Sequence, residues 1–156
     1  MVARGFSYLF LTVAIAILAG CGGGAMVKAP VAPTQAIVKM RTSGTLPSGT
    51  TIDGIQATLT YPTTKGLSIT KNNVVASGVA SGLFESNVTN SGQVGLILVT
   101  TDGFQTGEFA TLTFGIAAGN SPVAGDFAIA SGARVIDTNS ATLTDLAVEI
   151  QSVTFQ

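Results

Sequence analysis

The most reactive side chain in this 156-residue sequence is a thiol, because Cys21 is its single cysteine. Other groups that support catalysis are scarce. The sequence has no histidine, which excludes a Ser-His-Asp triad, a histidine general base and an imidazole metal site. Its carboxylates are few and scattered. A glycosidase pair such as Asp102 and Glu108 is conceivable, but solvated charges at a turn and a strand edge are the simpler interpretation. We therefore predict a protein that is not an enzyme and that needs no cofactor.

The residues before Cys21 have the organisation of a secretory leader. Arg4 precedes an apolar run over residues 5–17, which small residues follow. The run is too short for a membrane span, which needs about 20 residues. Residues 18–21, Leu-Ala-Gly-Cys, resemble the lipobox of bacterial lipoproteins. This resemblance implies cleavage between Gly20 and Cys21 and acylation of Cys21. The alternatives are an ordinary signal peptide with an incidental cysteine, or an uncleaved anchor.

A lipidated Cys21 would place the protein at the cell envelope. Each buried methylene contributes roughly 0.8 kcal/mol, so several acyl chains, such as palmitate, hold a protein durably to a membrane. In Gram-negative lipoproteins an Asp after the cysteine commonly marks retention in the inner membrane. This sequence has Gly22 there, so we expect the outer membrane. A lipidated Cys21 also leaves no thiol for a disulfide.

Composition divides the chain into three parts. Residues 1–20 are predicted to be the signal peptide, residues 21–35 the lipidated cysteine with a flexible Gly- and Pro-rich tether, and residues 36–156 a single domain. Without Arg4 the chain has 7 − 1 = 6 basic and 8 acidic residues, a net charge of −2. The charges form no basic patch, so nucleic acid is excluded as a partner.

Short segments of alternating apolar and polar residues dominate the domain. They are separated by turns rich in Gly, Asn, Ser and Pro, which is typical of an antiparallel β-sandwich or jelly roll. We predict an all-β fold of about nine strands, with no helix after the leader. The predicted strands are 35–42, 52–61, 65–70, 74–77, 83–89, 93–100, 107–116, 125–137 and 142–155.

Three of these segments carry further information. Residues 93–100 are apolar on both faces, which predicts a central strand covered on both sides or paired against a second surface. Residues 83–89 are expected to form an edge. The last segment changes parity between Ile150 and Val153, which predicts a β-bulge near Ser152.

Two groups of residues are candidate binding sites. Strict alternation over 107–116 places Phe109 on the same face as Thr111 and Thr113. If that face is exposed, an aromatic among threonines would suit a flat binding surface, and the alternative is that the second sheet or a loop covers it. Residues 137–140, with Asp145, offer oxygen ligands for calcium, but without the spacing of a calcium loop. An Asx-stabilised turn is the favoured interpretation, so no metal site is predicted.

The pattern of strands resembles a cohesin domain over roughly residues 36–155. The matching features are Ala-Thr-Leu-Thr-Tyr at 57–61, a following Leu67 and Val-Val-Ala-Ser-Gly at 74–78. The glycine-initiated apolar strands at 92–98 and 107–116 also match. The sequence departs from the family at Pro62, where an Asp is usual.

The resemblance implies a nine-stranded jelly-roll sandwich whose family binds dockerin modules. It also implies kinship with sandwich-shaped carbohydrate-binding modules. Our leading hypothesis is therefore a membrane-anchored, non-catalytic module that makes protein–protein contacts through one sheet face. Polysaccharide binding is the second hypothesis, although a chain with no Trp and two Tyr offers few rings for sugar stacking. A structural envelope lipoprotein is the third.

Overall fold

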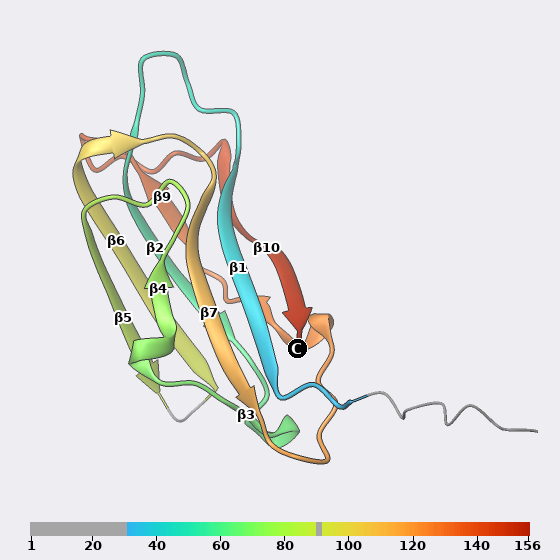
Figure 1. Ribbon diagram of the computed structural model, residues 1–156. Coiled ribbons are helices and arrows are strands. Elements are labelled where there is room, and N and C mark those ends of the chain that lie inside the picture. Colours follow the sequence, from blue (N-terminus) through green and yellow to red (C-terminus); the bar gives the residue numbers. More distant parts are fainter. Residues whose placement is uncertain (1–30, 90–91) are drawn as a thin grey trace, which may run out of the picture. The chain divides into compact units, whose positions relative to one another are not determined.

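Alternating side chains build the two sheets of this domain. In strand β2 (Ile52–Thr60), Ile55, Ala57 and Leu59 are buried, while Gln56 and Thr58 lie on the other side. The computed structural model describes residues 31–89 and 92–156, and Figure 1 shows their arrangement. The segment from Val31 to Gln156 is one compact unit that contains the whole described core, so it can be studied as a separate domain. The predicted leader and most of the predicted tether lie outside the described residues.

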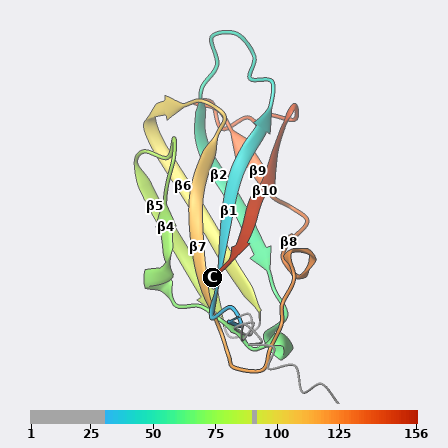
Figure 2. The same ribbon diagram turned by 45° about the vertical axis from the view of Figure 1, so that its right-hand side comes forward.

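The domain is an antiparallel β-sandwich of two five-stranded sheets (Figures 1 and 2). One sheet has the order β10-β1-β7-β3, with β4 also paired to β7. The other has the order β5-β6-β2-β8, with β9 also paired to β2. Besides β2, the strands are β1 (Gln35–Gly44), β3 (Leu67–Ser68), β4 (Val74–Ala76), β5 (Leu83–Thr89), β6 (Gln93–Phe104), β7 (Glu108–Ile116), β8 (Ala128–Ile129), β9 (Arg134–Ile136) and β10 (Leu146–Phe155).

The chain crosses repeatedly from one sheet to the other, as expected for a jelly roll. Three single 3₁₀ turns lie in the connections: η1 (Thr63–Lys65), η2 (Lys71–Asn73) and η3 (Ala124–Asp126). Within the described ranges, no helix is long and apolar enough to cross a membrane. The predicted all-β sandwich is confirmed. The predicted strand at 125–137 is divided into β8 and β9, because residues 130–133 turn between them.

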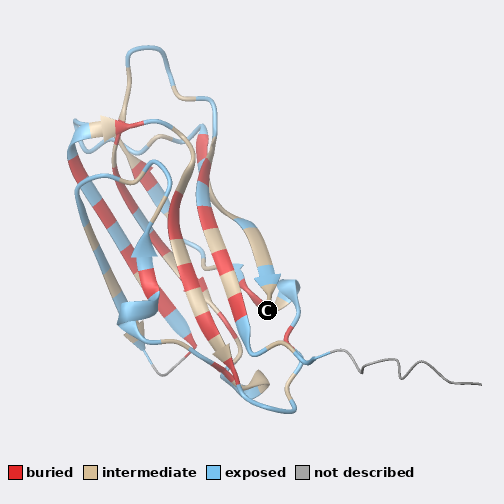
Figure 3. Cartoon of the chain, viewed as in Figure 1, coloured by how far each residue is buried: buried red, intermediate tan, exposed pale blue. Residues whose placement is uncertain are grey.

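The inward faces of both sheets meet in one hydrophobic core (Figure 3). Aromatic rings bridge it: the Phe114 ring centroid lies 4.9 Å from that of Tyr61 and 5.1 Å from that of Phe127. Burial raises the pKa of the Tyr61 hydroxyl above its usual value. Thr42 is a rare buried polar residue, and its hydroxyl accepts the N–H of Gly107 at 3.1 Å. This bond ties the end of β1 to the start of β7.

A β-bulge in β7 overturns the prediction that Phe109 lies on the same face as Thr111 and Thr113. Met40 of β1 pairs with Ala110, but Arg41 pairs with Glu108, so Phe109 is an extra residue without its own partner. The bulge changes the parity of the strand, and both Phe109 and Ala110 are fully buried. Phe109 therefore belongs to the core and not to a binding face.

The predicted bulge in β10 is confirmed. Lys39 pairs with Ser152 and Met40 with Ile150, which leaves Gln151 as the extra residue. β6 differs from its prediction in two respects. It continues to Phe104 instead of ending near Thr100, and only one of its faces is covered. Val94, Leu96 and Leu98 are buried on the inward side, and the outward side is open.

The position of Phe109 can be tested by its contribution to stability. We expect Phe109→Ala to lower the free energy of unfolding by about 3–5 kcal/mol, because it removes a buried ring and leaves a cavity. Thr113→Ala, on the outward side of the same strand, should change it by less than about 0.5 kcal/mol. Urea denaturation of residues 31–156 measures both values. Equal, small effects would place Phe109 at the surface.

Candidate functional site

The pairing register arranges the outward residues of the β5-β6-β2-β9 sheet in rows. The first row across the strands contains Leu83, Val99, Gly54 and Ile136. The second contains Glu85, Ile97, Gln56 and Arg134. A third contains Asn87, Gly95 and Thr58. We call this outward surface, defined by the three rows, the groove face.

Large aliphatic side chains are exposed together on the groove face. Leu83 is 62%, Ile97 49% and Val99 45% exposed. Leu83 and Val99 are direct cross-strand partners, and Ile97 is the next outward residue of β6. Outward residues in adjacent rows are close enough to form one patch. Clustered apolar exposure of this kind marks an interaction surface, whereas single exposed residues do not.

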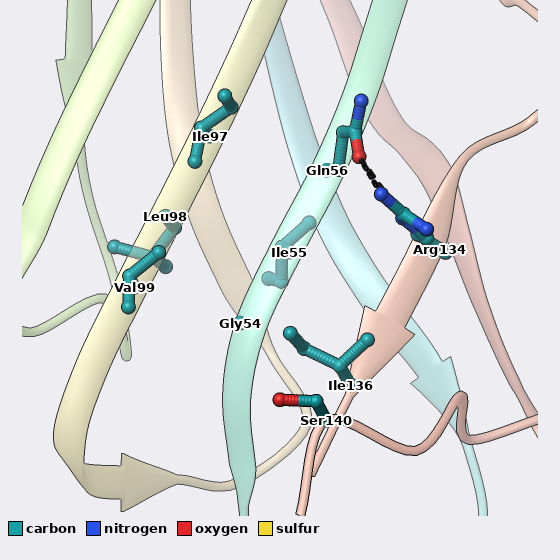
Figure 4. A pocket seen from close by; sticks show the side chains of 9 residues that line it. All are labelled: Gly54, Ile55, Gln56, Ile97, Leu98, Val99, Arg134, Ile136 and Ser140. Atoms are coloured by element: carbon teal, nitrogen blue, oxygen red, sulfur yellow. Dashed lines mark hydrogen bonds between the residues drawn. The ribbon is translucent and has the colours of Figure 1, made fainter. Parts of the chain in front are cut away.

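The first of two hollows in this face is apolar (Figure 4). It has a volume of about 230 Å³ and lies between Ile97 and Val99 on one side and Ile136 on the other, over Gly54. The Arg134 guanidinium lies at its rim. Its Nε and Nη2 donate to Gln56 Oε1 at 2.9 and 2.7 Å. In Figure 4 the amide nitrogen of Gln56 points along β2, away from Gly54.

The second hollow, which we call the polar hollow because it has more polar lining than the first, lies on the other side of the Ile97–Gln56 ridge. It has a volume of about 350 Å³, and its floor is Gly95. Side chains of Glu85, Asn87 and Thr58 surround it. The Glu85 carboxylate also accepts a hydrogen bond from Lys71 Nζ at 2.8 Å. The groove face thus offers an apolar site and a polar site next to each other.

The two glycines that open these hollows have different relations to the fold. A Cβ on Gly54 would lie 2.8 Å from Ile136 Cγ1 and 2.9 Å from its Cδ1, so a larger residue there would force the Ile136 side chain to move. A Cβ on Gly95 would meet nothing closer than Asn87, at 3.8 Å. Glycine inside a strand costs about 0.5–1 kcal/mol relative to alanine. Because packing does not require Gly95, its effect is to keep the polar hollow open.

The loop after β9 closes one end of the apolar hollow. Asp137 Oδ1 accepts the backbone N–H groups of Asn139 at 2.9 Å and Ala141 at 2.8 Å. This confirms the Asx-turn interpretation of residues 137–140. Ser140 lines the hollow and has a φ of 62°, the one positive φ of a non-glycine residue in the described part of the chain. Within the same ranges, no group of three or more metal-ligating side chains gathers.

Thr111 and Thr113 lie on the outward side of the other sheet, which we call the ion-pair face. Lys39 Nζ is 3.0 Å from Glu108 Oε2, and Arg41 Nη2 is 2.7 Å from Glu149 Oε1. The Thr111 hydroxyl lies 3.0 Å from that of Ser77 and 3.3 Å from Glu108 Oε1. The structure therefore ties Thr111 to side chains of its own sheet, and it separates Thr111 and Thr113 from the buried Phe109.

The charge state of Glu108 bears on the conceivable glycosidase pair. Hydrogen bonds from Ser77 and then from Lys39 lower the pKa of its carboxyl below the usual value. A glycosidase general acid needs the opposite, a raised pKa that keeps its proton near neutral pH. Glu108 is thus an ion-pair partner and unsuited to that role.

Sequence reasoning did not locate the groove face. Its residues come from β2, β5, β6 and β9, and no local pattern links them. One signal was present: the outward residues Ile97 and Val99 make β6 apolar on both faces. This signal predicts a strand that is covered on both sides or paired against a second surface, whereas the structure leaves the outward side open. Cys21, the other predicted site, lies outside the described residues.

The contrast between the two glycines predicts a difference in stability. Gly95→Thr should raise the free energy of unfolding by about 0.5–1 kcal/mol, because it replaces an unneeded glycine with a residue that favours strands. Gly54→Ala should give no such gain, because Ile136 must move. Thermal and urea unfolding of residues 31–156 measure both. A destabilised Gly95→Thr variant would mean that the fold itself requires this glycine.

Comparison with known proteins adds a structural likeness. No protein-family model and no curated protein sequence matches the chain. Among solved structures, the sixth cohesin of scaffoldin B from Acetivibrio cellulolyticus is similar, with a TM-score of 0.57 and 20% sequence identity. The match covers 71% of this chain and 82% of that cohesin, which was crystallised in complex with a mutant Cel5 dockerin. At this identity the likeness concerns the fold alone, and the described domain has a cohesin-like β-sandwich fold.

Proposed function

We propose that this domain is a non-catalytic module that binds a protein partner through the groove face. The observation that carries the proposal is the exposed aliphatic patch of Leu83, Ile97 and Val99 beside an apolar hollow. Burying such a patch against a partner is favourable by roughly 25 cal/mol per Å² of apolar surface. On the ion-pair face Val75 is 48% exposed, but its cross-strand partner is Thr111, so it lacks the aliphatic neighbours that Leu83, Ile97 and Val99 provide for one another.

The shape and chemistry of the groove face favour a protein over a polysaccharide. Sugar rings stack on aromatic side chains, and none of the residues in its three rows is aromatic. Aliphatic side chains next to small hollows instead suit side chains of a protein. The likeness to a cohesin that was crystallised with a dockerin supports a partner of the dockerin kind. The polar hollow, with its amide, hydroxyl and carboxylate groups, is the feature that keeps sugar binding as the second candidate.

Sequence features support a location for this activity. We infer that the leader is cleaved before Cys21 and that the acylated cysteine anchors the protein to the outer membrane. The support is the Leu-Ala-Gly-Cys tetrad at the end of an apolar leader, together with Gly22 in place of Asp. An anchor of this kind would hold the binding domain at the cell envelope.

The binding proposal can be tested with a display library of protein fragments that tiles the genome of the source organism. Residues 31–156 serve as bait, and the matched variants are Ile97→Asp on the groove face and Thr113→Asp on the ion-pair face. We expect enriched fragments whose affinity falls at least about tenfold with Ile97→Asp and is unchanged with Thr113→Asp, because burying an unpaired charge is costly. Gly95→Thr, which fills the polar hollow, should also weaken binding.

Two results would contradict this proposal. Fragments that bind equally to wild type and to Ile97→Asp would place the binding site elsewhere. In the second result, no fragments are enriched, and insoluble cellulose, chitin or peptidoglycan depletes the domain from solution. If Gly95→Thr blocks this depletion, the polysaccharide candidate is favoured.

The anchoring proposal is tested separately in the full-length chain. Labelling with a palmitate analogue in a Gram-negative host should mark the wild type and leave Cys21→Ser unlabelled, because the thiol is the acceptor. Gly22→Asp should keep the label but move the protein to the inner-membrane fraction of a density gradient. A labelled Cys21→Ser variant would disprove the assignment.

A further inference from the structure

Arg134 differs from every other described basic residue in having no acidic partner. Of the seven Lys and Arg residues, Arg4 and Lys28 lie outside the described ranges. Four of the remaining five form ion pairs at 2.7–3.0 Å, namely Lys39 with Glu108, Arg41 with Glu149, Lys65 with Asp126 and Lys71 with Glu85. Arg134 is exposed on the groove face, and no carboxylate of the described chain lies within ion-pair distance.

The Arg134 side chain is nevertheless held in a defined position. Two of its five N–H donors bind the Gln56 side-chain oxygen, at 2.9 Å from Nε and 2.7 Å from Nη2. The Nη1 group and the second N–H of Nη2 remain available to donate hydrogen bonds to a partner. These two groups form the end of the guanidinium fork, which has the geometry to bind both oxygens of a carboxylate. Gln56 thus orients the fork before any partner arrives.

The residues around Arg134 indicate which kind of partner side chain would lie next to a carboxylate bound by Arg134. Ile136 is two residues further along β9, and Ile97 lies beyond Gln56 in the same row. Both line the apolar hollow together with Arg134. An apolar side chain in the hollow would exclude water beside the guanidinium and strengthen a charge-assisted hydrogen bond there.

We infer that Arg134, oriented by Gln56, recognises a carboxylate of the protein partner, and that this acidic residue lies next to an apolar side chain that fills the hollow over Gly54. The inference rests on the proposed function and adds the chemistry of the partner to it. Charge complementarity supports this inference. The unpaired Arg134 selects an acidic group, and the adjacent aliphatic wall selects an apolar one. Arg134 is accordingly a specificity-determining residue of the groove face.

The test uses the genome-fragment library and residues 31–156. Enriched fragments that depend on Ile97 are taken forward, and their dissociation constants are measured by fluorescence anisotropy. We expect Arg134→Glu to weaken binding at least about tenfold and Arg134→Met, which keeps the stem without the charge, to weaken it less. Replacing one Asp or Glu of the fragment by Lys should abolish binding to wild type and restore binding to Arg134→Glu. Denaturation of each variant checks that the fold is intact.

The outcomes separate the two proposals. Fragments that depend on Ile97 but bind Arg134→Glu as tightly as wild type would overturn the inference about Arg134 and leave the groove face as the binding site. Fragments that lose affinity with Arg134→Glu but show no rescue by any acid-to-lysine exchange would also overturn it. A complete lack of fragments that depend on Ile97 would overturn the binding site and the inference together.

Discussion

The pairing register of β2 with β6 is the constraint on which the groove face depends. Because side chains alternate along a strand, a slip of one residue would bury Gln56 and expose Ile55. In the observed register, the outward positions of β2 are Gly54, Gln56 and Thr58, and they align with Val99, Ile97 and Gly95 of β6. A glycine therefore stands opposite a larger residue in the first and the third row, and Gln56 and Ile97 form the ridge between them. This alignment produces two hollows on either side of one ridge.

The two outward faces of the sandwich satisfy their polar groups in different ways. On the ion-pair face, Lys39 and Arg41 pair with carboxylates of neighbouring strands, and the Thr111 hydroxyl is hydrogen-bonded within the same sheet. On the groove face, Arg134 bonds to a neutral amide and keeps part of its donor capacity. Exposed ion pairs contribute little to stability, so this difference between the two faces affects recognition of a partner more than it affects the stability of the fold. A surface whose charges are already paired has less to offer a partner than one with an oriented, unpaired cation.

Much of the architecture was accessible from periodicity and turn residues. Alternation identified β2, β5 and β7 within about one residue, and the parity change between Ile150 and Val153 revealed the bulge in β10. The same rule failed in β7, because the bulge at Phe109 lies one residue from the start of the strand, and Glu108 alone is too short a segment to reveal the change of parity. The alternation rule also failed for the outward side of β6. An apolar outward side can mean burial beneath another layer or exposure to a partner, and the sequence pattern is the same in both cases.

The sequence by itself determined the class of fold, the positions of most strands along the chain and the presence of a lipobox-like tetrad. Each of these depends on residues that are neighbours in the chain, namely period-two alternation, turn residues and an apolar run before Cys21. Only the tertiary structure decided which face is open and what chemistry it presents. Gly54, Ile97 and Arg134 are separated by about 40 residues each, and they meet because β2 pairs with β6 on one edge and with β9 on the other. Strand pairing is a long-range event that propensities do not encode. The grouping of an unpaired guanidinium, an aliphatic wall and a glycine hollow is therefore a property of the folded sheet.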